Sequence, residues 1–74
     1  MKYHAVIELR EGDVIDLRLY PEDREAVARA HALAIAKENT ECSEEEILEH
    51  FETHASHSEG DWSVQLADAH VHES

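Results

Sequence analysis

Residues Ser43 to His57 read Ser-Glu-Glu-Glu-Ile-Leu-Glu-His-Phe-Glu-Thr-His-Ala-Ser-His, and the expected fold is organised around this stretch. Ser43, followed by Glu46 three residues later, matches a capping box and predicts the start of a helix. The acidic first turn complements the positive end of the helix dipole. One face of this helix is apolar and is expected to be buried, through Ile47, Leu48, Phe51 and Ala55.

Another face of the same helix is a row of carboxylates. Glu45, Glu49 and Glu52 follow the i, i+4, i+7 spacing that places side chains about 5–6 Å apart on one helix face. A rigid row at this spacing can occupy a groove built for nucleic-acid phosphates. We expect the row to extend at one end through Glu41 and Glu44, and at the other through Glu59 and Asp61. A solvated helix face is the alternative, but no Lys or Arg occurs from residue 38 to residue 74, whereas exposed helices usually mix both signs.

Between these two faces lies a row of histidines. His50, His54 and His57 repeat the i, i+4, i+7 spacing, and a His-x-x-x-His pair on a helix can bind zinc. The zinc-protease pattern is not met, because Phe51 stands where that pattern needs a glutamate. The three histidines are therefore candidate metal ligands. The competing interpretation is a boundary row that gains charge below about pH 6.5.

The chain is strongly acidic. Its 74 residues contain eighteen Asp and Glu against six Lys and Arg, a formal net charge of −12. Such a surface repels nucleic acid and anionic membranes and attracts basic proteins, so we expect a basic protein partner and neither nucleic acid nor membrane. Adaptation to a high-salt environment is the alternative origin of the acidity.

The single cysteine, Cys42, excludes an internal disulfide, and no stretch approaches transmembrane length. We therefore predict a cytoplasmic protein. The acidic neighbours Glu41 and Glu44 are expected to raise the pKa of the Cys42 thiol. No serine elbow, glycine-rich phosphate loop or activated cysteine is present, so neither an enzyme nor a cofactor is expected.

Alternation of apolar and polar residues predicts an N-terminal hairpin. Tyr3–Arg10 and Val14–Tyr20 both alternate, and Gly12 lies between them. With a three-residue loop, Glu11 to Asp13, each apolar residue on the inner face of one strand lies opposite an apolar residue of the other strand. The pairs are Leu9 with Ile15, Ile7 with Leu17, and Ala5 with Leu19.

A helix is expected from Pro21 to about Glu38, with His31 as a boundary histidine. Its expected apolar arc contains Ala26, Val27, Ala30, Leu33, Ala34 and Ile35. Ser56–Gly60 is expected to be a polar turn, and Asp61–Asp68 a third strand with Trp62 in the core. Residues 69–74 are expected to fray.

These elements predict one α+β domain over residues 1–74, in the order β-β-α-α-β. The simplest layering is a three-stranded antiparallel sheet with two helices packed on one face. The strand order beyond the first hairpin stays open, and so does the choice between a monomer and a small homo-oligomer.

In size, acidity and element order, the chain resembles the small acidic inhibitors of phages and mobile elements, including anti-CRISPR proteins and DNA mimics. This resemblance implies a non-enzymatic protein that blocks a basic nucleic-acid-binding groove on a host protein such as a CRISPR effector. The opening Met-Lys-Tyr-His-Ala-Val-Ile-Glu is also similar to the first strand of HicB-type antitoxins. That family's Cys-Pro-Glu-Leu-Pro-Gly region is missing here. Two alternative functions follow: an antitoxin that binds a basic ribonuclease toxin, and a metal-dependent or pH-responsive module built on the histidines.

Overall fold

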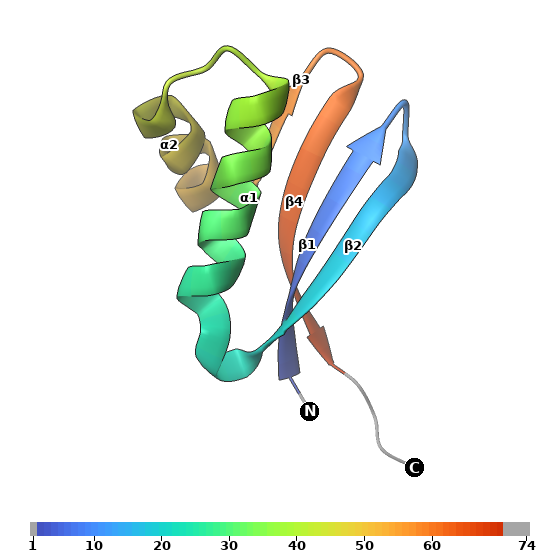
Figure 1. The fold of residues 1–74 in the computed structure, drawn as a ribbon, viewed down its shortest axis with the longest axis vertical. Coiled ribbons are helices and arrows are strands. Elements are labelled where there is room, and N and C mark those ends of the chain that lie inside the picture. Colours follow the sequence, from blue (N-terminus) through green and yellow to red (C-terminus); the bar gives the residue numbers. More distant parts are fainter. Residues whose placement is uncertain (1, 71–74) are drawn as a thin grey trace.

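The computed structural model describes residues 2–70, which form a single sheet covered on one side by two helices (Figure 1). The sheet has four antiparallel strands in the order β2-β1-β4-β3. The elements in chain order are β1 Lys2–Arg10, β2 Asp13–Pro21, the short 3-10 helix η1 Glu22–Arg24, α1 Glu25–Asn39, α2 Glu44–His54, β3 Ser56–Glu59 and β4 Trp62–His70. Among the described residues, no helix is long and apolar enough to cross a membrane.

The prediction of a three-stranded sheet is wrong, because the segment that was predicted to be a polar turn forms an additional strand. Ser56–Glu59 is strand β3, which pairs with β4 at one edge of the sheet. A four-residue edge strand is held mainly by backbone hydrogen bonds to one neighbour, so its polar side chains do not prevent it from forming. The α+β class and the placement of both helices on one face agree with the expectation.

Strand β4 also runs further than expected. Ala69 and His70 were expected to belong to a frayed tail, but they pair with Tyr3 and Lys2 of β1. Two further strand positions are therefore added to the centre of the sheet. The rest of the expected tail, residues 71–74, lies outside the described residues.

The first hairpin has the expected register over most of its length but a different loop. Ile7 faces Leu17 and Ala5 faces Leu19, as predicted, whereas Leu9 faces Val14 and not Ile15. The loop has two residues, Glu11 and Gly12, with φ of 53° and 85°. Positive φ at both positions gives the twist that suits a tight hairpin. The residue removed from the loop is absorbed by a β-bulge after Glu8.

The core lies between the helices and one face of the sheet. Its buried residues are Val6, Trp62 and Val64 from the sheet, Ala28, Ala32 and Ala36 from α1, and Ile47 and Phe51 from α2. The three alanines repeat every fourth residue and let the α1 backbone approach the sheet closely. Trp62 is buried as predicted, and its indole N–H donates to Glu8 Oε2 at 2.8 Å.

The expected buried faces of the helices are only partly correct. On α1, Leu33 and Ile35 pack against the core, but Val27 is 45% exposed. On α2, Leu48 is 40% exposed, and Ala55 is exposed at the end of the helix. The helical segment after β2 begins with η1 at Glu22, and α1 itself begins at Glu25.

His31 is a half-buried boundary residue with a hydrogen-bond partner, as predicted. Its Nδ1 lies 3.0 Å from the hydroxyl of Tyr20, and the two rings meet edge to face. This contact ties the end of β2 to the middle of α1.

Candidate functional site: the acidic end and the histidine pair

The start of helix α2 is built as its sequence predicts. The backbone N–H of Glu46 donates to Ser43 Oγ at 3.3 Å, so Ser43 is the N-cap. Three glutamates fill the first turn, where the helix dipole favours acidic side chains. The helix ends at His54, because Ala55 adopts a left-handed conformation with φ of 55°. His57 therefore lies outside the helix, in β3.

The carboxylates of the α2 row point into solvent. Glu45, Glu49 and Glu52 are all exposed, and none forms an ion pair within the described residues. Glu44, at the start of the helix, has a basic partner at 3.7 Å, the Nζ of Lys37. The row spans two turns, so its charges act on a partner as a line about 10 Å long.

The chain reverses after α2 and brings two further predicted acids back to the start of the helix. β3 follows α2 directly and runs alongside it in the opposite direction (Figure 1). The charge of Glu59 consequently acts on both Cys42, just before α2, and His57. Glu59 and Asp61 were expected to continue the row beyond its far end, but the charge of Glu59 acts instead at Cys42, just before the start of the helix.

The tip of the first hairpin joins this group. The backbone N–H of Glu11 donates to the carbonyl oxygen of Asp61 at 2.7 Å, which links the tips of the two hairpins. The hairpin tips, the end of α1 and the start of α2 lie at one end of the elongated molecule (Figure 1). The residues that we call the acidic end are Glu11, Glu41, Glu44, Glu45, Glu59 and Asp61. Sequence reasoning missed Glu11, because only the tertiary contact between the hairpins brings it there.

The charge is distributed very unevenly along the chain. Residues 1–37 contain all six basic residues and seven acidic ones, a net charge of −1. Residues 38–74 contain eleven acidic residues and no basic one, a net charge of −11. Nine of these eleven acidic residues lie between Glu38 and Asp61, in the segment that runs from the end of α1 through α2 and β3, so most of this charge is gathered in one part of the fold.

Two of the three candidate metal ligands, His50 of α2 and His57 of β3, are in contact with each other. The Nδ1 atoms of His50 and His57 lie 2.7 Å apart, and their rings are stacked with centroids 4.9 Å apart. His57 is 2% exposed, and its Nε2 has no hydrogen-bond partner in the described structure. Burial, and next the charge of His50, lower the pKa of His57 below its ordinary value, whereas Glu46 and Glu59 act in the opposite direction.

The histidines do not assemble a metal site with a full set of ligands. His54 is exposed on α2 and is absent from the His50–His57 contact. Within residues 2–70, no group of three or more His, Cys, Asp or Glu side chains is placed to hold a metal ion. The pair is therefore best described as two imidazoles that share a hydrogen bond.

Cys42 lies beside the same helix and is not activated. A hydrogen bond to Glu46 raises the pKa of its thiol, and desolvation raises it further. The predicted direction of the pKa shift is confirmed, but the main cause is Glu46 and not its sequence neighbours Glu41 and Glu44. The thiol therefore stays protonated at neutral pH.

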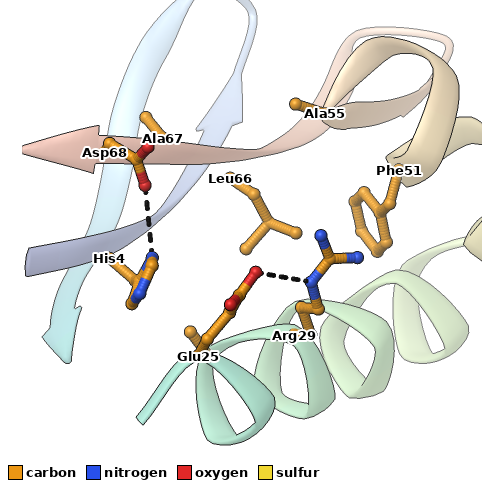
Figure 2. A pocket seen from close by; sticks show the side chains of 9 residues that line it. His4, Glu25, Arg29, Phe51, Ala55, Leu66, Ala67 and Asp68 are labelled. Carbon is orange, nitrogen blue, oxygen red and sulfur yellow. Dashed lines mark hydrogen bonds and ion pairs between the residues drawn. The ribbon is translucent and has the colours of Figure 1, made fainter. Parts of the chain in front are cut away.

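A separate hollow of about 220 Å³ lies between α1, the sheet and the end of α2 (Figure 2). His4 bonds through Nδ1 to Asp68 at 3.2 Å and through Nε2 to the carbonyl oxygen of Glu22 at 3.1 Å. Arg29 bonds to Glu25 at 3.4 Å. The polar side chains of the hollow thus already have partners, and its nine lining residues include no Ser, Thr, Cys or Lys that His4 would activate.

The chain matches no protein-family model, and comparisons with curated proteins and with solved structures give no match. Its function is accordingly inferred from its charges and its geometry.

Proposed function

We propose that this protein is a non-enzymatic inhibitor that places carboxylates in a basic, nucleic-acid-binding groove of another protein, as a mimic of phosphates. The observation that carries the proposal is the α2 row of Glu45, Glu49 and Glu52. These side chains are exposed and have no ion pair among the described residues, in a half-chain without one basic residue. A CRISPR effector is one example of a target with such a groove.

The arrangement of the acidic groups supports this function in two ways. The row is presented by a helix whose start is capped and whose inner face is fixed in the core by Ile47 and Phe51, so the carboxylates are held in place before binding. The acidic end then extends the charged surface beyond the helix. Long-range attraction by such a surface accelerates association with a basic protein and makes it sensitive to salt.

The test is capture of bacterial proteins on the immobilised chain at about 50 mM and about 500 mM NaCl. The captured proteins are expected to bind nucleic acid, to be displaced by duplex DNA or RNA, and to be lost at the higher salt. The variant E45Q/E49Q/E52Q removes the row. It is expected to lower capture at least about tenfold, which corresponds to about 1.4 kcal/mol.

A matched control removes three charges elsewhere. Glu22, Asp23 and Glu25 lie at the opposite end of α1 from the acidic end, and the variant E22Q/D23N/E25Q is expected to capture as well as the wild type. Equal losses in both variants would mean that only net charge matters and would refute docking through the row. Capture that nucleic acid cannot displace would refute phosphate mimicry. Recovery of a basic ribonuclease would instead favour the antitoxin alternative.

A further inference from the structure

The face of the sheet that points away from the helices is free of charge. Strand neighbours alternate between faces, so the buried Val6 and Val64 define the covered face, and Ile7, Leu17 and Leu19 lie on the open one. The strand positions on this open face are Tyr3, Ala5, Ile7, Leu9, Val14, Leu17, Leu19, Pro21, Ser56, Ser58, Ser63, Gln65, Ala67 and Ala69. None is charged, in a chain of which 32% is charged.

The exposed side chains of this face are apolar on β2, whereas β3 and the neighbouring part of β4 contribute Ser56, Ser58, Ser63 and Gln65, which are polar but uncharged. Val14, Leu17 and Leu19 are between 49% and 59% exposed, and the bulge residue Ile15 is 50% exposed. An antiparallel sheet with one face in water normally places polar residues on that face. Here the charged strand residues, such as Glu8, Asp16 and Arg18, lie on the covered face instead. The β1–β2 half of the open face therefore has the composition of a buried surface.

We infer that the open face is the interface of a homodimer, in which two copies pack sheet against sheet. A partner for this surface must itself present an uncharged, apolar surface, and the same face of a second copy does so by symmetry. The long strands have nine residues, so the face measures about 30 Å by about 15 Å. Two such faces bury on the order of 1,000 Å², which is near the lower limit for a specific interface and fits a weak dimer.

The charge of −12 does not oppose this arrangement. In a dimer of packed sheets, the helix layers lie on the outside, roughly 30 Å apart. This separation is several times the Debye length of about 8 Å at physiological salt, so the repulsion between the two α2 rows is screened. A symmetric pairing through α2 would bring the two rows of carboxylates together.

Pairing through the sheet edge is disfavoured by the strand that forms it. β2 is the edge strand beside β1, and it carries the bulge residue Ile15 and ends at Pro21, while the other edge strand, β3, has only four residues. Bulges and prolines are features that prevent edge strands from pairing with other chains. The face of the sheet, and not its edge, is therefore the surface that a second copy covers.

Sedimentation equilibrium of the full chain tests the inference, with the expected mass being twice the 8.4 kDa of one chain. The variant L17K/L19K places four ammonium groups in the interface of a dimer and is expected to raise its dissociation constant at least about 100-fold. These lysines lower the net negative charge of each chain, so any loss of association is not due to a larger net charge. The matched control is V27K/L48K, which makes the same change at two exposed positions of the helix layer and is expected to remain dimeric.

A wild-type chain that stays monomeric at about 1 mM would overturn the inference, because weak dimers of this size associate at that concentration. A dimer that persists in folded L17K/L19K would also overturn it. If L17K/L19K does not fold, methyl NMR of the wild type decides. The signals of Leu17 and Leu19 are expected to shift with concentration and those of Val27 and Leu48 to stay fixed, and the reverse pattern would refute the interface. Dimerisation is also expected to persist at high salt, which separates it from the salt-sensitive docking of α2.

Discussion

His50 and His57 place their Nδ1 atoms 2.7 Å apart, which joins the last turn of α2 to the edge strand β3. His57 is the buried member of the pair, and burial lowers its pKa below the ordinary 6.5. A lowered histidine pKa means that the unfolded chain binds the proton more tightly than the folded one. The contribution of His57 to the free energy of unfolding is therefore fully present above about pH 6.5. It is lost as the pH falls through the lower pKa of the folded state.

This relationship predicts a specific loss of stability in acid. Between about pH 7 and about pH 5, the free energy of unfolding of the wild type should fall by up to about 1.4 kcal/mol per pH unit through His57. In H57L this contribution should disappear, whereas in H54Q, which alters an exposed histidine, it should remain. Urea unfolding followed by circular dichroism at several pH values measures the slopes. Equal slopes in H57L and the wild type would contradict the assignment.

A second prediction concerns the bond between Trp62 and Glu8. The E8A variant leaves the buried indole N–H without its acceptor, and it should destabilise the protein by about 1–3 kcal/mol. E8Q keeps an acceptor oxygen and should cost less. A double-mutant cycle with W62F isolates the pair, and a coupling energy near zero would show that Glu8 acts by some other contact.

A third prediction concerns the residue that ends α2. Ala55 has φ of 55°, a conformation that glycine adopts without steric cost. We expect A55G to raise the free energy of unfolding by about 0.5–1 kcal/mol. The matched change A30G, at an exposed position inside α1, should lower it by about 1 kcal/mol. Thermal unfolding of the two variants gives the comparison, and a loss of stability in A55G would argue against the left-handed conformation.

A fourth prediction separates the stability of α2 from its proposed function. Glu45, Glu49 and Glu52 repel one another, and Glu49 and Glu52 lie toward the negative end of the helix dipole. The variant E49Q/E52Q should therefore be about 0.5–1 kcal/mol more stable than the wild type at low salt. The gain should shrink at about 0.5 M NaCl, where surface charges are screened. A gain that does not depend on salt would require a cause other than charge.

The sequence predicts the local features of this fold well. The cap at Ser43, the burial of Trp62 and the facing pairs Ile7–Leu17 and Ala5–Leu19 depend on residues close in sequence or on turn geometry. The bulge shows the limit of this approach. A two-residue loop with one extra residue in β2 keeps the pairs Ile7–Leu17 and Ala5–Leu19 and replaces Leu9–Ile15 by Leu9–Val14. All of these pairs are apolar, so apolar pairing alone does not distinguish the two loops.

The failures have physical causes. Helix α1 has alanine at every second position from Ala26 to Ala36, so its apolar period is blurred, and only the sheet selects Ala28, Ala32 and Ala36 for burial. Strand β3 is polar because an edge strand needs no apolar face. The contact of His57 with His50, and the return of Glu59 to the start of α2, both follow from β3. The sequence therefore named the candidate residues other than Glu11, but it did not predict how they are arranged.

The uneven charge also determines how the molecule moves before it touches anything. A body with −11 in one half of its chain and −1 in the other is an electric dipole as well as an anion. In the field of a basic surface it experiences a torque, which turns the acidic end toward that surface during diffusion. Collisions then begin more often in a productive orientation, and the orientational search that slows most protein associations is shortened. The first half of the chain is nearly neutral and, apart from Glu11 at the acidic end, adds little to this attraction.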